Sequence, residues 1–530
     1  MIQRLLIAAG VWLLLCLSSG QAQALTPDRA RAIAAGETDA RIAALNAAVA
    51  AGDPGLPAYV QALLDDAVKL TPKQVLVIDG TAVRDAATGQ PATLPDDAED
   101  VLNNNRMRGV LQAAQAALQL FASELATRRE AVQALARQGM DESQLPLLDK
   151  ALAAESDAAV RARLTQLRAG LLVGSSDRAR RLEAVQLLAA SSEPTVKALL
   201  AERLALETDA ELRSALRRAI EAIDSRLAWG ERLGLVFTGL SLGSILLLVA
   251  LGLAISYGLM GVINMAHGEL MMVGAYATYV VQNLFRAHLP AAWFDAYVLA
   301  AVPVSFLVAA AVGAVLERSV IRWLYGRPLE TLLATWGISL VLMQAVRSIF
   351  GAQNVPVENP GWLSGGVALM SNLTLPYNRI AIIVFAFAVL AGVALLIART
   401  RLGLFVRGVT QNRRMAACVG VNTARTDTYA FALGAGIAGL AGCALSQVGN
   451  VGPDLGQNYI VDSFMVVVLG GVGQLAGTVI AALGLGVLNK LLEDWAGAVL
   501  AKIMVLVFIV VFIQKRPQGL FAMKGRSAEA

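Results

Sequence analysis

The chain has 530 residues, of which 56% are hydrophobic and 16% are charged. Soluble domains carry about 25% charged residues, so this composition and a mean hydropathy of +0.59 exclude a wholly soluble protein. The net charge of +4 does not indicate nucleic-acid binding, because the basic residues lie between apolar runs. The three cysteines are too far apart for a CxxC metal or redox pair, and we expect no metal and no cofactor.

Residues 1–24 have the features of a signal peptide. Arg4 precedes an apolar stretch at 5–17, and an A-Q-A cleavage motif ends at Ala24. An uncleaved membrane anchor is the alternative. Both interpretations place residue 25 and the chain that follows it outside the cytoplasmic membrane, so we expect a periplasmic N-terminal domain.

Residues 25–228 are predicted to form a helical domain, because apolar residues recur at i, i+3 and i+4 among Ala, Arg, Asp and Glu. Three similar helix starts, ESDAAVRARL at 155, SSEPTVKALL at 191 and ETDAELRSAL at 207, each combine a capping Ser or Thr with an acid. Their recurrence predicts stacked helical hairpins of the HEAT kind. Residues 72–92 predict a short β-hairpin or loop insertion. The domain's surface is either simply solvated or a docking platform for another extracytoplasmic protein.

Residues 229–520 are predicted to form an all-α polytopic membrane domain, followed by a cytoplasmic tail at 521–530. Most candidate spans have the 17–25 apolar residues that a crossing of the hydrocarbon core needs. We expect about eight spans, counting one glycine-broken hairpin as a single span, at 233–256, 266–285, 297–316, 329–350, 379–398, 426–446, 460–490 and 498–514. Each side of the hairpin is short, so its LGGVGQLAG tip is predicted to lie at membrane depth, buried in protein.

The distribution of Lys and Arg orients this domain. Loops 317–328 and 399–425 and the C-terminal tail are rich in basic residues, whereas loops 351–378 and 447–459 contain none. The positive-inside rule places the basic segments in the cytoplasm of a bacterial cell, with the protein in the inner membrane. Counting spans backwards puts residue 230 outside, which agrees with the signal peptide.

Polar residues interrupt the first two spans. The stretch GVINMAHGEL, 261–270, brings Asn264, His267 and Glu269 into an apolar sequence, shortly after Tyr257. An ionisable side chain at bilayer depth costs roughly 2.5–3.5 kcal/mol. In one interpretation a discontinuous helix lines a polar pathway for a small solute. In the other, Asn264 and His267 hydrogen-bond to neighbouring helices, and Glu269 lies in water at the cytoplasmic interface. The H-x-E pattern also occurs in zinc deaminases, but no P-C-x-x-C accompanies it.

A second break, VVVLGGVGQLAGTV at 466–479, surrounds Gln474 with glycines. Paired breaks in two halves are typical of a transporter with a central site, although glycines also let helices pack closely. Arg347, near the outer end of its span, is expected to extend to the membrane interface. The candidate pathway residues are Tyr257, Asn264, His267, Glu269 and Gln474.

The basic segment RTRLGLFVRGVTQNRRMAACVGVNTARTDTYAFALGAGIAGLAG, 399–442, contains an amphipathic stretch at 406–418 and then re-enters the membrane. It resembles the cytoplasmic coupling segment of permeases in the branched-chain amino acid type of ABC importers, the LivH-like family. LSLGSILLLVALGLAISYGLMGVINMAHGELMMVGAY and DSFMVVVLGGVGQLAGTVIAA resemble two further signatures, so the resemblance covers 233–520. The residues assigned to ATPase coupling from this resemblance are Arg407, Gly408, Asn412, Ala416 and Gly420.

The resemblance implies that a short helix here docks into an ATPase subunit. It also implies a LivM-like second permease, two ABC ATPases and an extracytoplasmic binding protein as partners, besides membrane lipid. The chain has no G-x-x-x-x-G-K-[ST] motif, so we expect it not to be an enzyme and ATP hydrolysis to come from separate subunits. The extension at 25–228 is similar to that of urea-transporter (UrtB-type) permeases, because ordinary LivH-like permeases begin almost directly at the first span.

Urea is therefore the expected substrate, with a urea-binding protein as partner. A neutral polar solute suits amide and hydroxyl groups without fixed charge. The alternative is a permease for branched-chain amino acids or short-chain amides. An ion-coupled carrier would not explain the arginine-rich loop, and a signalling receptor would need an output domain where only a short tail follows the last span.

Overall fold

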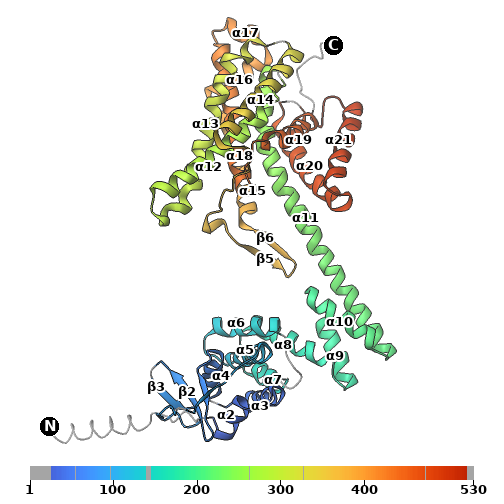
Figure 1. Ribbon diagram of the computed structural model, residues 1–530. Helices are drawn as coiled ribbons and strands as arrows, with labels where there is room; N and C mark the ends of the chain where they lie inside the picture. Colours follow the sequence, from blue (N-terminus) through green and yellow to red (C-terminus); the bar gives the residue numbers. More distant parts are fainter. Residues whose placement is uncertain are drawn as a thin grey trace, which may run out of the picture. The chain divides into compact units, whose positions relative to one another are not determined.

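The computed structural model describes residues 25–521, apart from 54, 81, 96, 139–144, 262, 326 and 472. The predicted signal peptide and residues 522–530 of the predicted tail lie outside the described residues. The chain divides into two compact units, one ending at Leu227 and one beginning at Ala228, within helix α11 (Ala210–Met260) (Figure 1).

The N-terminal unit contains short helices and one small sheet. Its helices are α2 (Pro27–Ala34), α3 (Thr38–Ala51), α4 (Leu56–Leu64), α5 (Asn105–Gln119), α6 (Leu125–Gln138), α7 (Leu145–Ala154), α8 (Ala158–Leu172), α9 (Arg178–Leu188), α10 (Pro194–Leu206) and the start of α11. Its strands are β1 (Val68–Leu70), β2 (Val75–Asp79), β3 (Ala82–Asp85) and β4 (Glu99–Asp100), in the antiparallel order β3-β2-β1-β4. The expected hairpin is present as β2 and β3. Two strands that the sequence did not reveal extend the sheet, since β1 pairs with β2 and β4 pairs with β1.

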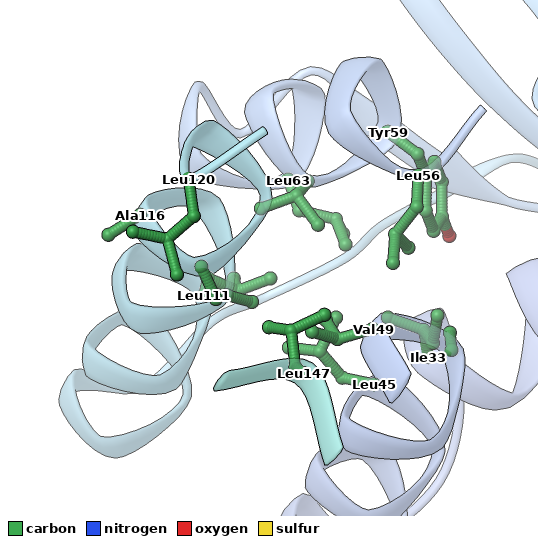
Figure 2. Packing of buried hydrophobic residues seen from close by; sticks show 14 of the residues in the cluster. Ile33, Leu45, Val49, Leu56, Tyr59, Leu63, Leu111, Ala116, Leu120 and Leu147 are labelled. Carbon is green, nitrogen blue, oxygen red and sulfur yellow. The ribbon is translucent and has the colours of Figure 1, made fainter. Parts of the chain in front are cut away.

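Two hydrophobic cores stabilise this unit. Figure 2 shows the first, in which Leu45, Leu63 and Leu111 come from three different helices and are fully buried. The second is formed by residues of the four consecutive helices α8 to α11, among them Leu200 and Leu216. Each fully buried leucine contributes about 1.5–3 kcal/mol relative to an exposed one, so the periodic apolar positions of the sequence account for this packing.

The helices from α6 onward repeat one set of contacts. Glu155, buried before α8, accepts hydrogen bonds from Arg128 of α6 at 2.9 Å and from the backbone N–H groups of the two residues that follow it. Three helices further along, Glu207 is buried before α11, pairs with Arg181 of α9 at 3.3 Å and accepts from its own two following N–H groups. The helical repeat is therefore visible in its polar contacts, and its assignment to the HEAT kind stays a prediction.

Aspartates, rather than the expected Ser or Thr residues, cap two of these helices. Asp157 Oδ1 accepts the backbone N–H of Val160 at 3.0 Å, and Asp209 Oδ1 accepts that of Leu212 at 3.2 Å. A carboxylate at this position also interacts favourably with the helix dipole. The capping residue is thus the acid that follows the Ser or Thr in the repeated sequence.

The membrane unit is built from long apolar helices (Figure 1). Besides α11, they are α12 (His267–His288), α13 (Tyr297–Ser319), α14 (Pro328–Phe350), α15 (Tyr377–Arg399), α16 (Arg401–Gln411), α17 (Arg413–Cys418), α18 (Thr423–Ser446), α19 (Leu455–Gly470), α20 (Leu475–Ala496) and α21 (Ala498–Lys515). The 3-10 helices η2 (Ala291–Ala296), η3 (Ile321–Trp323) and η4 (Gly361–Leu363) and the hairpin of β5 (Gly366–Met370) and β6 (Leu373–Pro376) complete it. Helix α18 packs against α12 and α13, and 83% of its span is buried.

Seven of the described helices are long and apolar enough to cross a membrane, which confirms an all-α polytopic protein. They are Ala210–Gly258, Ala291–Trp323, Leu329–Phe350, Tyr377–Arg399, Thr423–Ser446, Leu475–Ala496 and Ala498–Lys515. Six agree with expected spans, and the seventh, α20, is the second half of the expected hairpin. The span expected at 266–285 is α12, which is not among the seven because its polar residues lower its mean hydropathy.

The expected hairpin is longer than predicted, and its turn is not at membrane depth. Gly471 and Gly473 form the turn with φ of 95° and 78°, a region that favours glycine. The backbone N–H of Leu520, which follows α21, donates to the carbonyl of Leu469 at 2.8 Å. Helix α20 has 22 residues, or about 33 Å at 1.5 Å per residue. The turn therefore lies at the end of the bundle where α21 finishes.

The two ends of the bundle differ in charge. At one end, the loops without basic residues meet through a β-bridge between Val355 and Val451. At the other end, Arg413 pairs with Asp427 and lies over the ring of Tyr325. This separation agrees with the orientation derived from the positive-inside rule.

The first prediction concerns the repeated ion pair. The Arg128 hydrogen bond lowers the pKa of Glu155 to about 2, from its usual 4.5. Glu155→Gln should lower the free energy of unfolding of segment 25–227 at pH 7 by about 1–3 kcal/mol, because Arg128 loses its charged partner. A carboxyl whose pKa falls on folding stabilises fully above its unfolded pKa. The difference in the free energy of unfolding between wild type and variant should therefore shrink as pH falls from 4.5 toward 2.

Circular dichroism during thermal unfolding measures the loss of stability at pH 7 and its dependence on pH. Glu130→Gln, which changes an exposed glutamate on α6, is the matched control and should change stability by less than about 0.5 kcal/mol. An equal loss in both variants, or a difference independent of pH, would contradict the prediction.

Candidate functional site

Helix α12 begins in the interior of the bundle rather than at its end. The Nε2 of His267, the first residue of α12, lies 3.2 Å from the carbonyl oxygen of Val249. Val249 precedes the end of α11 at Met260 by three helical turns, or about 16 Å. The chain therefore turns back into the bundle after α11, and α12 starts at membrane depth as a discontinuous helix.

Side chains satisfy the backbone at this break. Asn264 Oδ1 accepts the N–H of Ala266 at 3.1 Å, and Thr335 Oγ1 of α14 accepts the N–H of Met265 at 3.2 Å. Because hydrocarbon offers no water, each N–H that leaves a helix needs such a partner. The contact of His267 with α11 anchors the start of α12. The observed hydrogen bonds of His267 and Asn264 are therefore those that the structural interpretation expects. The Nδ2 of Asn264 is buried and has no hydrogen-bond partner among the described residues.

Glu269 is buried in protein and does not lie in water at the interface, so that expectation is wrong. Its residue is 1% exposed, and Ser339 Oγ of α14 donates to its Oε1 at 2.9 Å. Its Oε2 has no partner within the described part of the chain. Ser339 is also buried, so a hydrogen-bonded pair of polar side chains, Glu269 and Ser339, lies inside the bundle.

The two broken elements meet at a pair of glycines. A Cβ added to Gly268 would lie 2.5 Å from the carbonyl oxygen of Gly456, and one added to Gly456 would lie 2.5 Å from that of Gly268. Only hydrogen fits in this space, so the starts of α12 and α19 are in direct backbone contact. The tip of the second break approaches the end of α11 as well, since a Cβ added to Gly258 would lie 3.1 Å from the Cα atom of Gly473.

A cavity of about 340 Å³ opens beside the start of α19. Asn354, Asn458 and Asp454 contribute polar groups to its wall. Asp454 Oδ1 lies 2.5 Å from Arg347 Nη2. Arg347 therefore forms an ion pair and does not only extend to the membrane interface. Its partner, Asp454, belongs to the loop 447–459, which the sequence analysis placed outside the cytoplasm.

Tyr257 and Gln474 lie apart from this cluster. The ring of Tyr257 packs against that of Phe464 on α19, with centroids 6.4 Å apart. Gln474 precedes α20 and lines a second cavity of about 360 Å³ together with Arg407 of α16. Asn264, His267 and Glu269 are all buried near the start of α12, but each contacts a different partner. The structure places Gln474 beside the predicted coupling segment.

The predicted coupling residues form α16, α17 and the turn after α17. Asn412 caps α17, since its Oδ1 accepts a backbone N–H three residues later at 3.0 Å. Ala416 is buried and holds α17 against the bundle, and Gly420 has a φ of 89° where the chain leaves α17. Arg407 and Gly408 lie on α16, where Arg407 is exposed and faces the second cavity.

Sequence reasoning missed Thr335 and Ser339. Both lie in a stretch that was assigned only as an apolar span. They are four residues apart, which places them on one face of α14, and both contact the break before or within α12. Two hydroxyl residues at this spacing in an apolar span are the signal that could have revealed them.

The sequence matches the family described as "Branched-chain amino acid transport system / permease component" over residues 235–513. The chain belongs to this family. The permease is 31% identical to the high-affinity branched-chain amino acid transport system permease protein BraD of Pseudomonas aeruginosa over 286 residues, 53% of this chain and 93% of BraD. It is 28% identical to LivH of Escherichia coli and of Salmonella typhimurium over 291 residues, 54% of this chain and 94% of each relative. No solved structure matches the chain.

The second prediction tests the buried contact between α14 and α12. Ser339→Ala should lower the thermal stability of the detergent-solubilised permease, because Glu269 Oε1 loses its hydrogen-bond donor at a cost of about 1–3 kcal/mol. Ser348→Ala, on an exposed position of the same helix, is the matched control and should leave the unfolding temperature unchanged. Equal unfolding temperatures for the two variants would show that the Ser339 contact contributes no stability.

The third prediction concerns the glycine contact. Gly268→Ala should impair folding, because the added methyl group has no space against Gly456. Gly392→Ala in α15, where nothing lies within 4 Å of an added Cβ, should be neutral or slightly stabilising. The yield of monodisperse protein after size-exclusion chromatography measures the difference, and equal yields would refute the close contact.

Proposed function

We propose that the chain is the permease subunit of an ATP-driven importer in a bacterial inner membrane, with its N-terminal unit in the periplasm. The α16–α17 pair at the basic end of the membrane unit is the observation that carries this proposal. These helices lie outside the candidate spans. Together with the residue that follows α17, they expose four apolar side chains beside arginines: Leu404, Phe405, Met415 and Val419. Exposed apolar groups of this kind mark a surface for a partner subunit, here an ATPase.

In this proposal the chain does not hydrolyse ATP itself. Two ABC ATPase subunits supply the hydrolysis, and a LivM-like second permease and an extracytoplasmic binding protein complete the importer. The sequence lacks a phosphate-binding P-loop motif, which supports this division of labour.

Branched-chain amino acids are the first candidate substrate, because the relatives are permeases of branched-chain amino acid transport systems. An amino acid carries a carboxylate and an ammonium group. The Arg347–Asp454 pair beside the 340 Å³ cavity offers one oppositely charged partner for each. Short-chain amides would use the asparagine side chains of the same cavity.

Urea is a second candidate, and two observations favour it. The family match begins at residue 235, so the N-terminal unit precedes it, and such an extension is the feature that resembles urea-transporter permeases. Stretch 261–270 contains no Lys or Arg. It presents Asn264 Nδ2 as a donor and Glu269 Oε2 as an acceptor, and neither has a partner among the described residues. These two groups suit a neutral molecule that has both C=O and N–H groups.

The proposed pathway follows α19. This helix starts beside the 340 Å³ cavity and ends at the turn that lines the 360 Å³ cavity near Arg407. Closure of the ATPases displaces α16 and α17 and changes the packing around α19, so that one cavity opens as the other closes. In this proposal the Asn264–Glu269 break provides polar contacts for the solute.

The fourth prediction tests both coupling and substrate. Deletion of the gene in its host should abolish micromolar uptake of either radiolabelled leucine or radiolabelled urea. Wild-type chain should restore that uptake, and Arg407→Glu should restore it at least roughly tenfold less well, because the exposed coupling surface changes charge. Arg318→Glu, an exposed arginine near the same end but outside α16 and α17, is the matched control and should restore it fully.

The solute whose uptake is lost decides the substrate. Loss of leucine uptake alone would reject urea, and loss of urea uptake alone would reject branched-chain amino acids. Full restoration by Arg407→Glu would contradict the coupling role of α16.

A further inference from the structure

We propose that Arg413, Asp427, Glu317 and Tyr325 form a positioning network that transmits movement of α17 to the membrane helices and to the end of α11. The inference rests on the proposed function, because it assigns a role in coupling to residues around α17. None of these four residues belongs to the coupling set derived from the sequence.

The network begins at α17. Arg413, its first residue, pairs with Asp427 in the first turns of α18, and its guanidinium carbon lies 5.1 Å from the ring centroid of Tyr325. Asp427 is 0% exposed, and its Oδ1 has no hydrogen-bond partner among the described residues. Arg413 is therefore the cation that compensates a fully buried carboxylate, and it also stacks on an aromatic ring.

Glu317, near the end of α13, provides the second part. It is buried, and it accepts hydrogen bonds from Tyr325 Oη at 2.8 Å and from Thr428 Oγ1 of α18 at 2.6 Å. The hydroxyl of Tyr325 also lies 3.2 Å from the sulfur of Met260, the last residue of α11. One tyrosine therefore contacts α13, the cation of α17 and the helix end that precedes the break.

These contacts resist independent movement of α17. If α17 moved away alone, Arg413 would leave the Asp427 carboxylate buried without a cation, which is strongly unfavourable. A shift of α17 must therefore displace the start of α18 with it or exchange the partners of Arg413. Because α18 is the most buried of the candidate spans, its displacement reaches α12 and α13, which pack against it.

An arginine outside the proposed ATPase surface provides the control. Arg318 directly follows Glu317 on α13 and is exposed, and it forms no ion pair among the described residues. Asn412 and Ala416 anchor α17 independently of Arg413. Loss of the Arg413 side chain therefore leaves the helix in place and removes its electrostatic link to α18.

The test uses the complete importer in proteoliposomes, with its ATPases, partner permease and binding protein. ATP hydrolysis and uptake of radiolabelled leucine and radiolabelled urea are measured in parallel. Arg413→Gln and Asp427→Asn should retain hydrolysis within about twofold and lose roughly tenfold of the solute imported per ATP, whereas Arg318→Gln should match wild type. The double variant Arg413→Gln with Asp427→Asn removes both charges and should remain uncoupled although no charge is left buried alone.

Several outcomes would overturn the proposal. An unchanged ratio of solute to ATP in Arg413→Gln would show that the network transmits nothing. Recovery of the wild-type ratio in the double variant would show that the single variants only suffer from an unpaired charge. Loss of hydrolysis and uptake together, with loss of the assembled complex, would assign Arg413 to assembly. Uptake by the wild-type importer that is independent of ATP would instead refute the proposed function itself.

Discussion

The membrane unit depends on one constraint, which is that a backbone leaving a helix inside hydrocarbon must find hydrogen-bond partners in the protein. The chain leaves α11 after Met260, and α12 begins at His267, whose ring lies against Val249 in the interior of the bundle. Thr335 and the side chain of Asn264 accept the exposed N–H groups, and His267 anchors the start of the next helix. The polar residues that a solute could contact are therefore the ones that also make the break possible.

The same constraint brings the two halves of the membrane unit together. Backbone contact between Gly268 and Gly456 holds the starts of α12 and α19 against each other. Lipid offers no hydrogen-bond partners to a helix that begins inside the membrane. The start of α12 is instead covered by protein, namely the start of α19. The same short helix, α19, has a cavity near each of its ends.

Much of this fold could be predicted from the sequence. The apolar spans were found because hydrocarbon thickness dictates their length, and the break was found because Asn264, His267 and Glu269 are conspicuous in an apolar stretch. The depth of the turn between α19 and α20 could not be predicted. It depends on a contact between distant parts of the chain, the hydrogen bond from Leu520 to Leu469. Partners distant in the chain were missed for the same reason. Arg347 and Asp454 are 107 residues apart, and only the folded bundle brings them together.

The contacts of the N-terminal unit have a consequence for how its charges are compensated. Arg128 with Glu155, and Arg181 with Glu207, lie within consecutive groups of three helices, and each group contains both its arginine and its glutamate. Each buried glutamate therefore finds its cation within its own group. Neither pair depends on the other, so loss of one arginine leaves the second buried carboxylate compensated.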